Sequence, residues 1–150
     1  MNRYTLSQKL TWLIVLALSV ACRATPATPP VESPSPAPSL TILDAVTSRQ
    51  VGGDYVPLDI TSQFSPSETF YCVLQVADVE NETQIVARWH FGDTFISETT
   101  YTTEDDGSGY IAFELTSQQP WPEGIYRVDI LSAGSVIESV QFSVAKKSAG

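Results

Sequence analysis

The sequence contains one histidine, two cysteines and eight lysines and arginines in 150 residues, and these shortages exclude several kinds of site. His90 is the only imidazole, so a zinc centre made of histidines and cysteines has too few ligands. The chain also lacks the Gly-x-Ser-x-Gly turn, the His-Glu-x-x-His and Cys-x-x-Cys motifs and a glycine-rich phosphate loop. We therefore expect no catalytic residues, no metal and no bound cofactor.

The chain also lacks a hydrophobic run long enough to cross a membrane. Its longest apolar stretch, Leu10 to Ala21, has 12 residues and follows the basic residues Arg3 and Lys9. A helix that spans a hydrocarbon layer needs roughly 20 apolar residues. A shorter apolar segment behind basic residues is typical of a cleavable secretory signal, and we expect one over residues 1–21.

The five residues Leu18-Ser19-Val20-Ala21-Cys22 resemble the lipobox of bacterial lipoproteins. In that family the cysteine thiol is acylated, for example with palmitate, and the chain is cut just before it. The resemblance implies a lipid attached at Cys22 and an extracytoplasmic protein anchored in the cell membrane or an outer membrane. Two alternatives remain open, namely an ordinary signal cleaved near Ala24 and an uncleaved anchor.

Acidic side chains outnumber basic ones throughout the chain after the expected cleavage site. Without Arg3 and Lys9, the remaining chain carries six basic residues against all 17 acidic ones. Such a surface repels nucleic acid and anionic lipid head groups, so we expect no nucleic-acid partner.

Proline marks the next segment. Residues 22–39 hold six of the ten prolines and no aromatic residue. This composition cannot bury enough apolar area to offset ordering, and it predicts a disordered, proline-rich stalk. Fully extended in polyproline II geometry, such a stalk would reach roughly 50 Å.

From residue 40 to 144 the apolar residues alternate with polar ones, as in β-strands. The runs are five to eight residues long, rich in β-branched and aromatic types, and separated by Gly, Pro, Asn and Asp. After Cys22 no segment of ten or more residues has a helical pattern. We therefore predict an all-β, two-sheet sandwich of seven or eight strands, followed by a flexible tail over 145–150. The expected strands lie near 40–47, 55–61, 69–77, 84–91, 95–102, 110–116, 125–131 and 136–144.

Three stretches resemble a recurring bacterial immunoglobulin-like (Ig-like) module. They are Phe64–Phe70, Trp121–Val128 and Ser139–Val144, and Trp89 lies in a central strand between the first two. The resemblance implies an Ig-like β-sandwich over 40–144 in which Tyr126 acts as a tyrosine corner. The disulfide found in many members of that family is missing here. Because the family contains adhesion, spacer and binding proteins, the resemblance predicts architecture more strongly than function.

Three single positions have both a structural and a functional interpretation. With Cys22 acylated, Cys72 has no partner in the chain, and we expect a buried thiol rather than a reactive one. His90 alternates away from Trp89, so we expect it to face solvent beside Arg88. We expect Trp121 to close one end of the core, the alternative being a stacking platform for a sugar or peptide.

The acidic loop Glu104-Asp105-Asp106 is the remaining candidate site. Glycoside hydrolysis needs two carboxyl groups facing each other about 5 to 10 Å apart, whereas three successive loop residues should point in different directions. The loop also lacks the alternating acidic spacing of a calcium loop. We expect a solvated hairpin loop, with a weak calcium site as the alternative.

These features together predict a membrane-anchored extracytoplasmic lipoprotein that carries one non-catalytic binding or interaction module. Its partner would be the membrane, through the lipid, and an unknown protein or glycan. The alternative function is that of an inhibitor or chaperone-like partner of an envelope enzyme. A glycan-acting enzyme would depend on the acidic loop alone.

Overall fold

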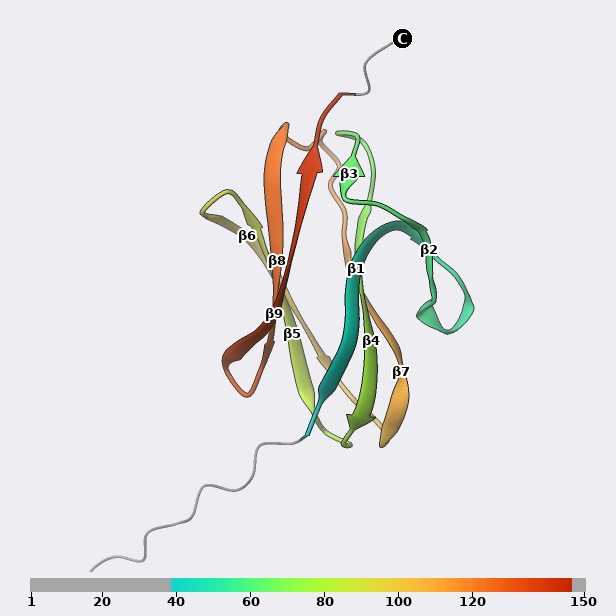
Figure 1. Cartoon of the computed structure of the whole chain (residues 1–150). Helices are drawn as coiled ribbons and strands as arrows, with labels where there is room; N and C mark the ends of the chain where they lie inside the picture. The colour runs from blue at the N-terminus through green and yellow to red at the C-terminus, as the bar shows by residue number, and fades with distance from the viewer. Residues whose placement is uncertain (1–38, 147–150) are drawn as a thin grey trace, which may run out of the picture. The chain divides into compact units, whose positions relative to one another are not determined.

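The computed structural model describes residues 39–146, which form two β-sheets packed face to face (Figure 1). The four-stranded sheet has the order β2-β1-β4-β7, and the five-stranded sheet has the order β3-β9-β8-β5-β6. A short turn, η1, lies between β1 and β2. The elements are β1 (Thr41–Val51), η1 (Gly53–Tyr55), β2 (Pro57–Ile60), β3 (Gln63–Phe64), β4 (Phe70–Val79), β5 (Gln84–Phe91), β6 (Thr94–Thr102), β7 (Gly107–Leu115), β8 (Gly124–Ser132) and β9 (Ser135–Val144).

The predicted fold class is confirmed. Each of the eight expected strands is present, and β5 has the predicted bounds. The structure adds β3, whose two residues pair in parallel with the end of β9. β2 is shorter than expected because η1 occupies the start of the predicted strand, and β7 begins earlier, at Gly107.

Alternation along the strands explains the core between the sheets. On β5 the side chains of Ile85, Ala87 and Trp89 are fully buried, while the residues between them lie on the outer face. β8 contributes Tyr126, Val128 and Ile130 to the same core by the same two-residue period. A slip of one residue in either strand would place this apolar set in water, so the pattern fixes the register.

Aromatic rings fill the end of the core near Val144. Phe70 packs against four other rings, and its centroid lies 4.8 Å from that of Phe64 and 4.9 Å from that of Phe142. Trp121 and Tyr126 complete the cluster at 5.0 and 5.6 Å from Phe70. This aromatic packing holds the two sheets together at that end, since the rings come from both of them.

The first and last described strands leave the sandwich at opposite ends. β1 begins beside the turn after β4, where the Glu80 amide donates to the Ser39 carbonyl at 3.2 Å, whereas β9 ends beside β3 (Figure 1). The loop that joins β6 to β7 lies at the same end as the start of β1. The acidic loop is therefore at the end where the chain enters the sandwich.

Candidate functional site

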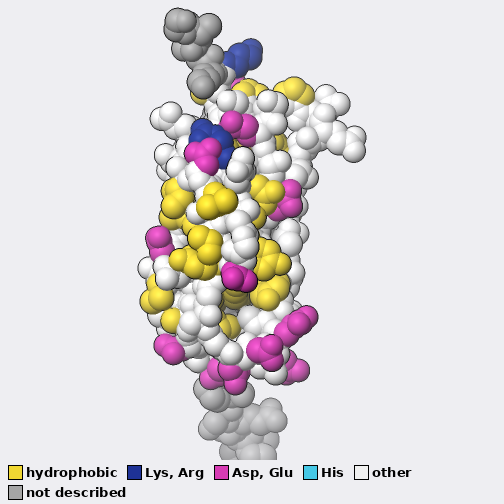
Figure 2. All heavy atoms as spheres, turned by 90° about the vertical axis from the view of Figure 1, so that its right-hand side faces the viewer, with side chains coloured by type: hydrophobic (Ala, Val, Ile, Leu, Met, Phe, Trp, Pro, Cys, Tyr) yellow, Lys and Arg dark blue, Asp and Glu magenta, His cyan; other side chains and the backbone are white. Residues whose placement is uncertain are grey.

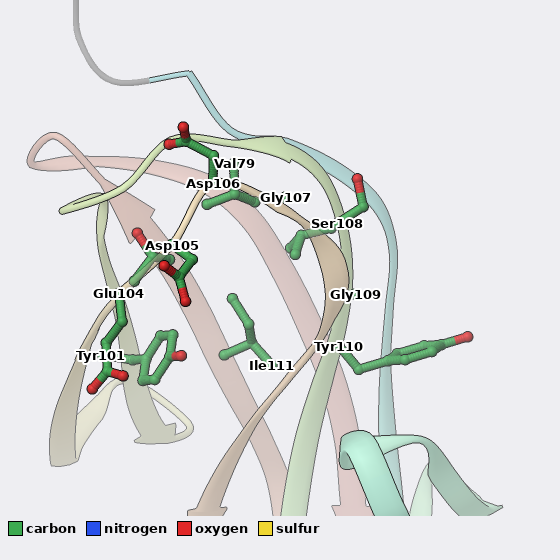
Figure 3. Close-up of a pocket in the computed structure, with 12 residues that line it drawn as sticks. Val79, Tyr101, Glu104, Asp105, Asp106, Gly107, Ser108, Gly109, Tyr110 and Ile111 are labelled. Carbon is green, nitrogen blue, oxygen red and sulfur yellow. The ribbon is translucent and has the colours of Figure 1, made fainter.

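A shallow pocket of about 290 Å³ lies at this end, between the end of β6, the loop 103–106 and the start of β7 (Figure 3). Its floor is apolar and its rim is acidic. The close-up shows Ile111 in the middle, with Tyr101 and Glu104 on one side and Val79 at the far edge. The lining residues are Val76, Val79, Tyr101, Thr103, Glu104, Asp105, Asp106, Gly107, Ser108, Gly109, Tyr110 and Ile111.

Hydrogen bonds to the β4–β5 turn hold the acidic loop in place. The buried Thr103 hydroxyl donates to the Glu80 carbonyl at 2.7 Å and accepts from the Thr83 amide at 2.9 Å. Asp106, at the rim of the pocket, accepts the Asn81 amide proton at 2.6 Å. The loop is exposed, as predicted, but it is not the predicted hairpin, because β6 and β7 belong to different sheets and the loop crosses from one sheet to the other.

The three carboxylates of this loop do not converge. Figure 3 shows Asp106 at the turn, Glu104 beside Tyr101 and Asp105 between them. Within residues 39–146, no group of three or more His, Cys, Asp or Glu side chains is placed to hold a metal ion. The calcium alternative gains no support, and the loop lacks the facing carboxylates that glycoside hydrolysis requires.

The expectation that His90 faces solvent is wrong. His90 does lie on the outer face of its sheet, but only 14% of its side chain is exposed. Arg88, the expected neighbour, turns away to Glu98, with its Nε 2.7 Å from the carboxylate. His90 is instead covered between Phe95, whose ring centroid is 6.2 Å away, and Asp129, whose Oδ2 is 3.4 Å from Nε2.

Asp129 is the centre of a polar cluster that sequence reasoning missed. Its carboxylate accepts the Ser139 hydroxyl proton at 2.6 Å and the Arg127 Nε proton at 2.9 Å. Burial acts to raise the pKa of Asp129, but the hydrogen bonds from Ser139 and Arg127, and the charges of Arg127 and His90, together lower it below its usual value. The two-residue alternation of β8 places Asp129 and Arg127 on one face. This alternation was the feature of the sequence that could have revealed the polar cluster.

The arrangement of this cluster differs from that of a serine–histidine pair. The Asp129 carboxylate, and not the imidazole, accepts the Ser139 proton. Neither ring nitrogen of His90 has a hydrogen-bond partner among the described residues. Activation of a serine needs the base to bond to the hydroxyl, so the cluster has the geometry of a structural network.

The structure confirms the expected roles of Cys72, Trp121 and Tyr126. Cys72 is fully buried on β4, and burial, with the negative charge of Glu138, raises the pKa of its thiol to about 12. Trp121 closes the core end and donates its Nε1 proton to the Glu68 carbonyl at 3.0 Å. The Tyr126 hydroxyl donates to the Pro122 carbonyl at 2.8 Å, which is the tyrosine corner.

A second candidate surface lies along β1, η1 and β2. Half of the exposed large apolar side chains come from this part of the chain, and Figure 2 shows hydrophobic side chains gathered on the side of the sandwich to which β2 belongs. We call these residues the β1–β2 apolar surface: Leu43, Tyr55, Val56, Leu58 and Ile60, which are 58%, 58%, 39%, 46% and 60% exposed.

The turn that carries this surface has a strained backbone. Asp54 and Tyr55 are consecutive residues with φ of 53° and 58°, and Asp59 has φ of 53°. This left-handed region is costly for residues other than glycine, and such strain concentrates at functional sites. The Gly52 amide and the Val56 carbonyl close the turn with a 2.8 Å hydrogen bond.

The predicted lipid attachment site cannot be placed in the fold. Cys22, the expected signal peptide and the proline-rich stalk up to residue 38 lie outside the described residues, as do residues 147–150. Between residues 39 and 146, the structure has no helix with the length and apolar character of a membrane span.

No protein-family model and no curated protein sequence matches the chain. Among solved structures, an immunoglobulin-like protein of Pseudomonas aeruginosa superposes with a TM-score of 0.51 at 10% identity, over 74% of this chain and 100% of that one. With the two-sheet topology, this likeness shows that the chain has the Ig-like fold.

Two further structures are similar at lower scores. The CARDB domain of a Pyrococcus furiosus protein, in complex with di-metal ions, has a TM-score of 0.42 at 14% identity over 74% of this chain and 96% of that one. A β-glucosidase of Listeria innocua in complex with glucose has a TM-score of 0.46 at 11% identity over 72% of this chain. The match spans 16% of the glucosidase.

Proposed function

We propose that the protein is a lipid-anchored extracytoplasmic lipoprotein whose Ig-like sandwich is a non-catalytic binding module for another protein of the envelope. The β1–β2 apolar surface is the observation that carries the binding role. Exposed apolar side chains that gather on one side of a small domain mark an interaction site, because their exposure is costly in a free monomer.

The backbone of the same surface supports this role. Asp54 and Tyr55 are the two left-handed central residues of the turn between β1 and β2, a conformation that fixes the turn, and Tyr55 is 58% exposed at its tip. Tyrosine is among the residues that most often carry binding energy in interfaces. This fixed turn, which presents an aromatic side chain, is therefore the proposed contact point for a partner.

The tether is supported by the sequence alone. The lipobox-like residues end at Cys22, and a proline-rich segment separates this cysteine from the sandwich. Two or more acyl chains give stable membrane attachment, at about 0.8 kcal/mol per buried methylene. A stalk that reaches roughly 50 Å would then present the sandwich beyond the head groups.

The binding role is tested by recovering partners from envelope extract with the full-length chain and with a Tyr55→Ser/Leu58→Ser variant. Val136→Ser is the matched control, because Val136 is 54% exposed on the other sheet. We expect one protein in stoichiometric amount with the parent and the control, and at least a tenfold loss with the double variant. Equal recovery with all three chains would contradict the role of this surface.

The anchor is tested separately by Cys22→Ser. We expect incorporation of labelled palmitate into the parent chain and none into the variant, which should also leave the membrane fraction or keep its signal. A variant that stays membrane-bound and is normally processed would show that Cys22 is not the anchor.

The second candidate function is inhibition or chaperoning of an envelope enzyme. The strained turn favours it, since a fixed, protruding loop can occupy an enzyme cleft at low entropic cost. If the recovered partner is an enzyme, its activity should fall when the parent protein is added and stay unchanged with Tyr55→Ser/Leu58→Ser.

A further inference from the structure

β6 is an edge strand of nine residues. It ends the five-stranded sheet, pairs with β5 on one side and has no strand on the other within residues 39–146. The other sheet edges are less available. β2 has four residues and begins with a proline, β3 has two residues, and β7 has η1 lying near it.

The core-facing side chains of β6 are only partly covered by the other sheet. Thr99 lies opposite Ala87 and Tyr101 opposite Ile85, and both β5 residues are fully buried in the core. Thr99 and Tyr101 therefore point to the core side of the sheet, yet Thr99 is exposed and Tyr101 is 43% exposed. The opposite sheet does not extend over them, which leaves a half-covered apolar ring beside an open backbone edge.

β6 also lacks the features that keep edge strands apart. It contains no proline, lysine or arginine, and the bulge at its start leaves Ser97–Thr102 in regular register with β5. Its one charged side chain, Glu98, is neutralised by Arg88 at 2.7 Å. In a strongly acidic protein, this edge therefore adds little repulsion to an approaching copy.

We propose that β6 pairs antiparallel with β6 of a second copy, about a two-fold axis at Thr100, so that the two five-stranded sheets become one. This register sets Thr100 against the second copy's Thr100 and Thr99 against its Tyr101. Threonine–threonine and aromatic–β-branched pairs are favourable across strands. Glu98 then lies opposite a threonine, and the two Glu98 residues are about 14 Å apart along the strands.

The same pairing leaves the β1–β2 apolar surface free, because that surface belongs to the other sheet. A single strand pair is a small interface, so the dimer should be weak in dilute solution. Two copies held on one membrane meet at a higher effective concentration, which favours pairing. Only the increase in effective concentration on the membrane depends on the proposed lipid anchor.

The test is disulfide cross-linking, in membranes that contain the full-length chain, of variants that each carry one introduced cysteine. Thr100→Cys should give a covalent dimer under mild oxidation, since directly opposed strand residues have the Cα spacing of a disulfide. Thr102→Cys is the matched control on the same strand, because two copies of residue 102 would be about 14 Å apart. Thr41→Cys, exposed on β1, controls for random collision.

Dimer formation at Thr100 at least tenfold above both controls would support the pairing. Adding Thr99→Lys to the Thr100→Cys chain should abolish it, because a lysine would replace the contact with Tyr101. Equal cross-linking at all positions, cross-linking at Thr102 alone, an adduct with a different protein, or no adduct would each overturn the proposal. The same samples also show whether the parent chain is in the membrane or the soluble fraction. A failure of the lipid anchor is therefore distinguished from a failure of the strand pairing.

Discussion

The Tyr126 hydroxyl donates a 2.8 Å hydrogen bond to the carbonyl oxygen of Pro122, four residues earlier. The ring of Tyr126 is buried in the aromatic cluster, stacked 5.4 Å from Phe142, while its hydroxyl reaches the loop before β8. One side chain thus fixes both the core packing and the path of the chain into β8.

Replacement of this tyrosine should separate the two contributions. Tyr126→Phe keeps the ring and removes the hydroxyl, which leaves the Pro122 carbonyl without this donor. We expect a loss of about 1 kcal/mol in the free energy of unfolding, measured by urea denaturation. Tyr110→Phe on β7 is the control and should change stability by less than about 0.5 kcal/mol. A neutral Tyr126→Phe would mean that the corner hydrogen bond adds no net stability.

Asp129 should make the protein sensitive to acid. Its pKa is lowered in the fold, so its contribution to stability is present above the usual value of 3.8 and is lost as the pH falls through the lower folded pKa. Asp129→Asn removes this contribution, and we expect about 1.5 to 3 kcal/mol lower stability at pH 7. The difference from the parent protein should shrink below pH 4 in thermal or urea unfolding.

The control for this variant is Glu98→Gln, which breaks an ion pair whose side chains are each 39% exposed. Such surface pairs contribute little, and we expect a change of less than about 1 kcal/mol with no marked pH dependence. A gap between parent and Asp129→Asn that stayed constant from pH 7 to pH 3 would assign the effect to packing instead of charge.

Cys72 should be inert in the folded protein. Its thiol is buried and its pKa is raised to about 12, so little thiolate exists at pH 8 and no reagent can reach it without opening of the fold. In a Cys22→Ser background, we expect reaction with a thiol reagent to be at least a hundredfold slower in buffer than in denaturant. Fast reaction in buffer would indicate local opening of β4.

The same thiol predicts a loss of stability in alkali. A raised folded pKa favours the neutral thiol, so its contribution is complete below the ordinary pKa of 9.0 and disappears as the pH rises towards 12. The parent should lose stability over this range faster than Cys72→Ala does. If the stability of the two proteins fell in parallel as the pH rises, the interpretation of Cys72 as a buried neutral thiol would be contradicted.

Periodicity predicted the sheets well because burial follows it directly. The two-residue period places Ile85, Ala87 and Trp89 on one face of β5, and all three are fully buried. The same alternation put His90 on the outer face but said nothing about what covers that face. Phe95 and Asp129 come from strands on either side of β5, and only the strand order brings them to His90.

The exposure of Tyr101 and the backbone of the β1–β2 turn were also harder to predict than the core. Tyr101 is on the core side of its strand, and a two-residue period would bury it. It is exposed because β6 is at the edge of the wider sheet, which is a property of the strand order. The strained turn at Asp54 and Tyr55 was equally hidden, because neither residue type marks a left-handed backbone as glycine does.

Gly124 tests whether the turn into β8 depends on glycine. Its φ is 150°, and a Cβ atom there would lie 2.7 Å from Cε2 of Phe91, whose ring packs 4.9 Å from that of Tyr126. Gly124→Ala must therefore displace Phe91 and strain the backbone, and we expect a loss of about 1 to 3 kcal/mol by urea denaturation. Gly53→Ala is the control, because nothing lies within 4 Å of its Cβ position and its φ is outside the left-handed region. Adding Phe91→Leu should recover part of the loss if the clash dominates, and a double variant no more stable than Gly124→Ala would assign the cost to the backbone.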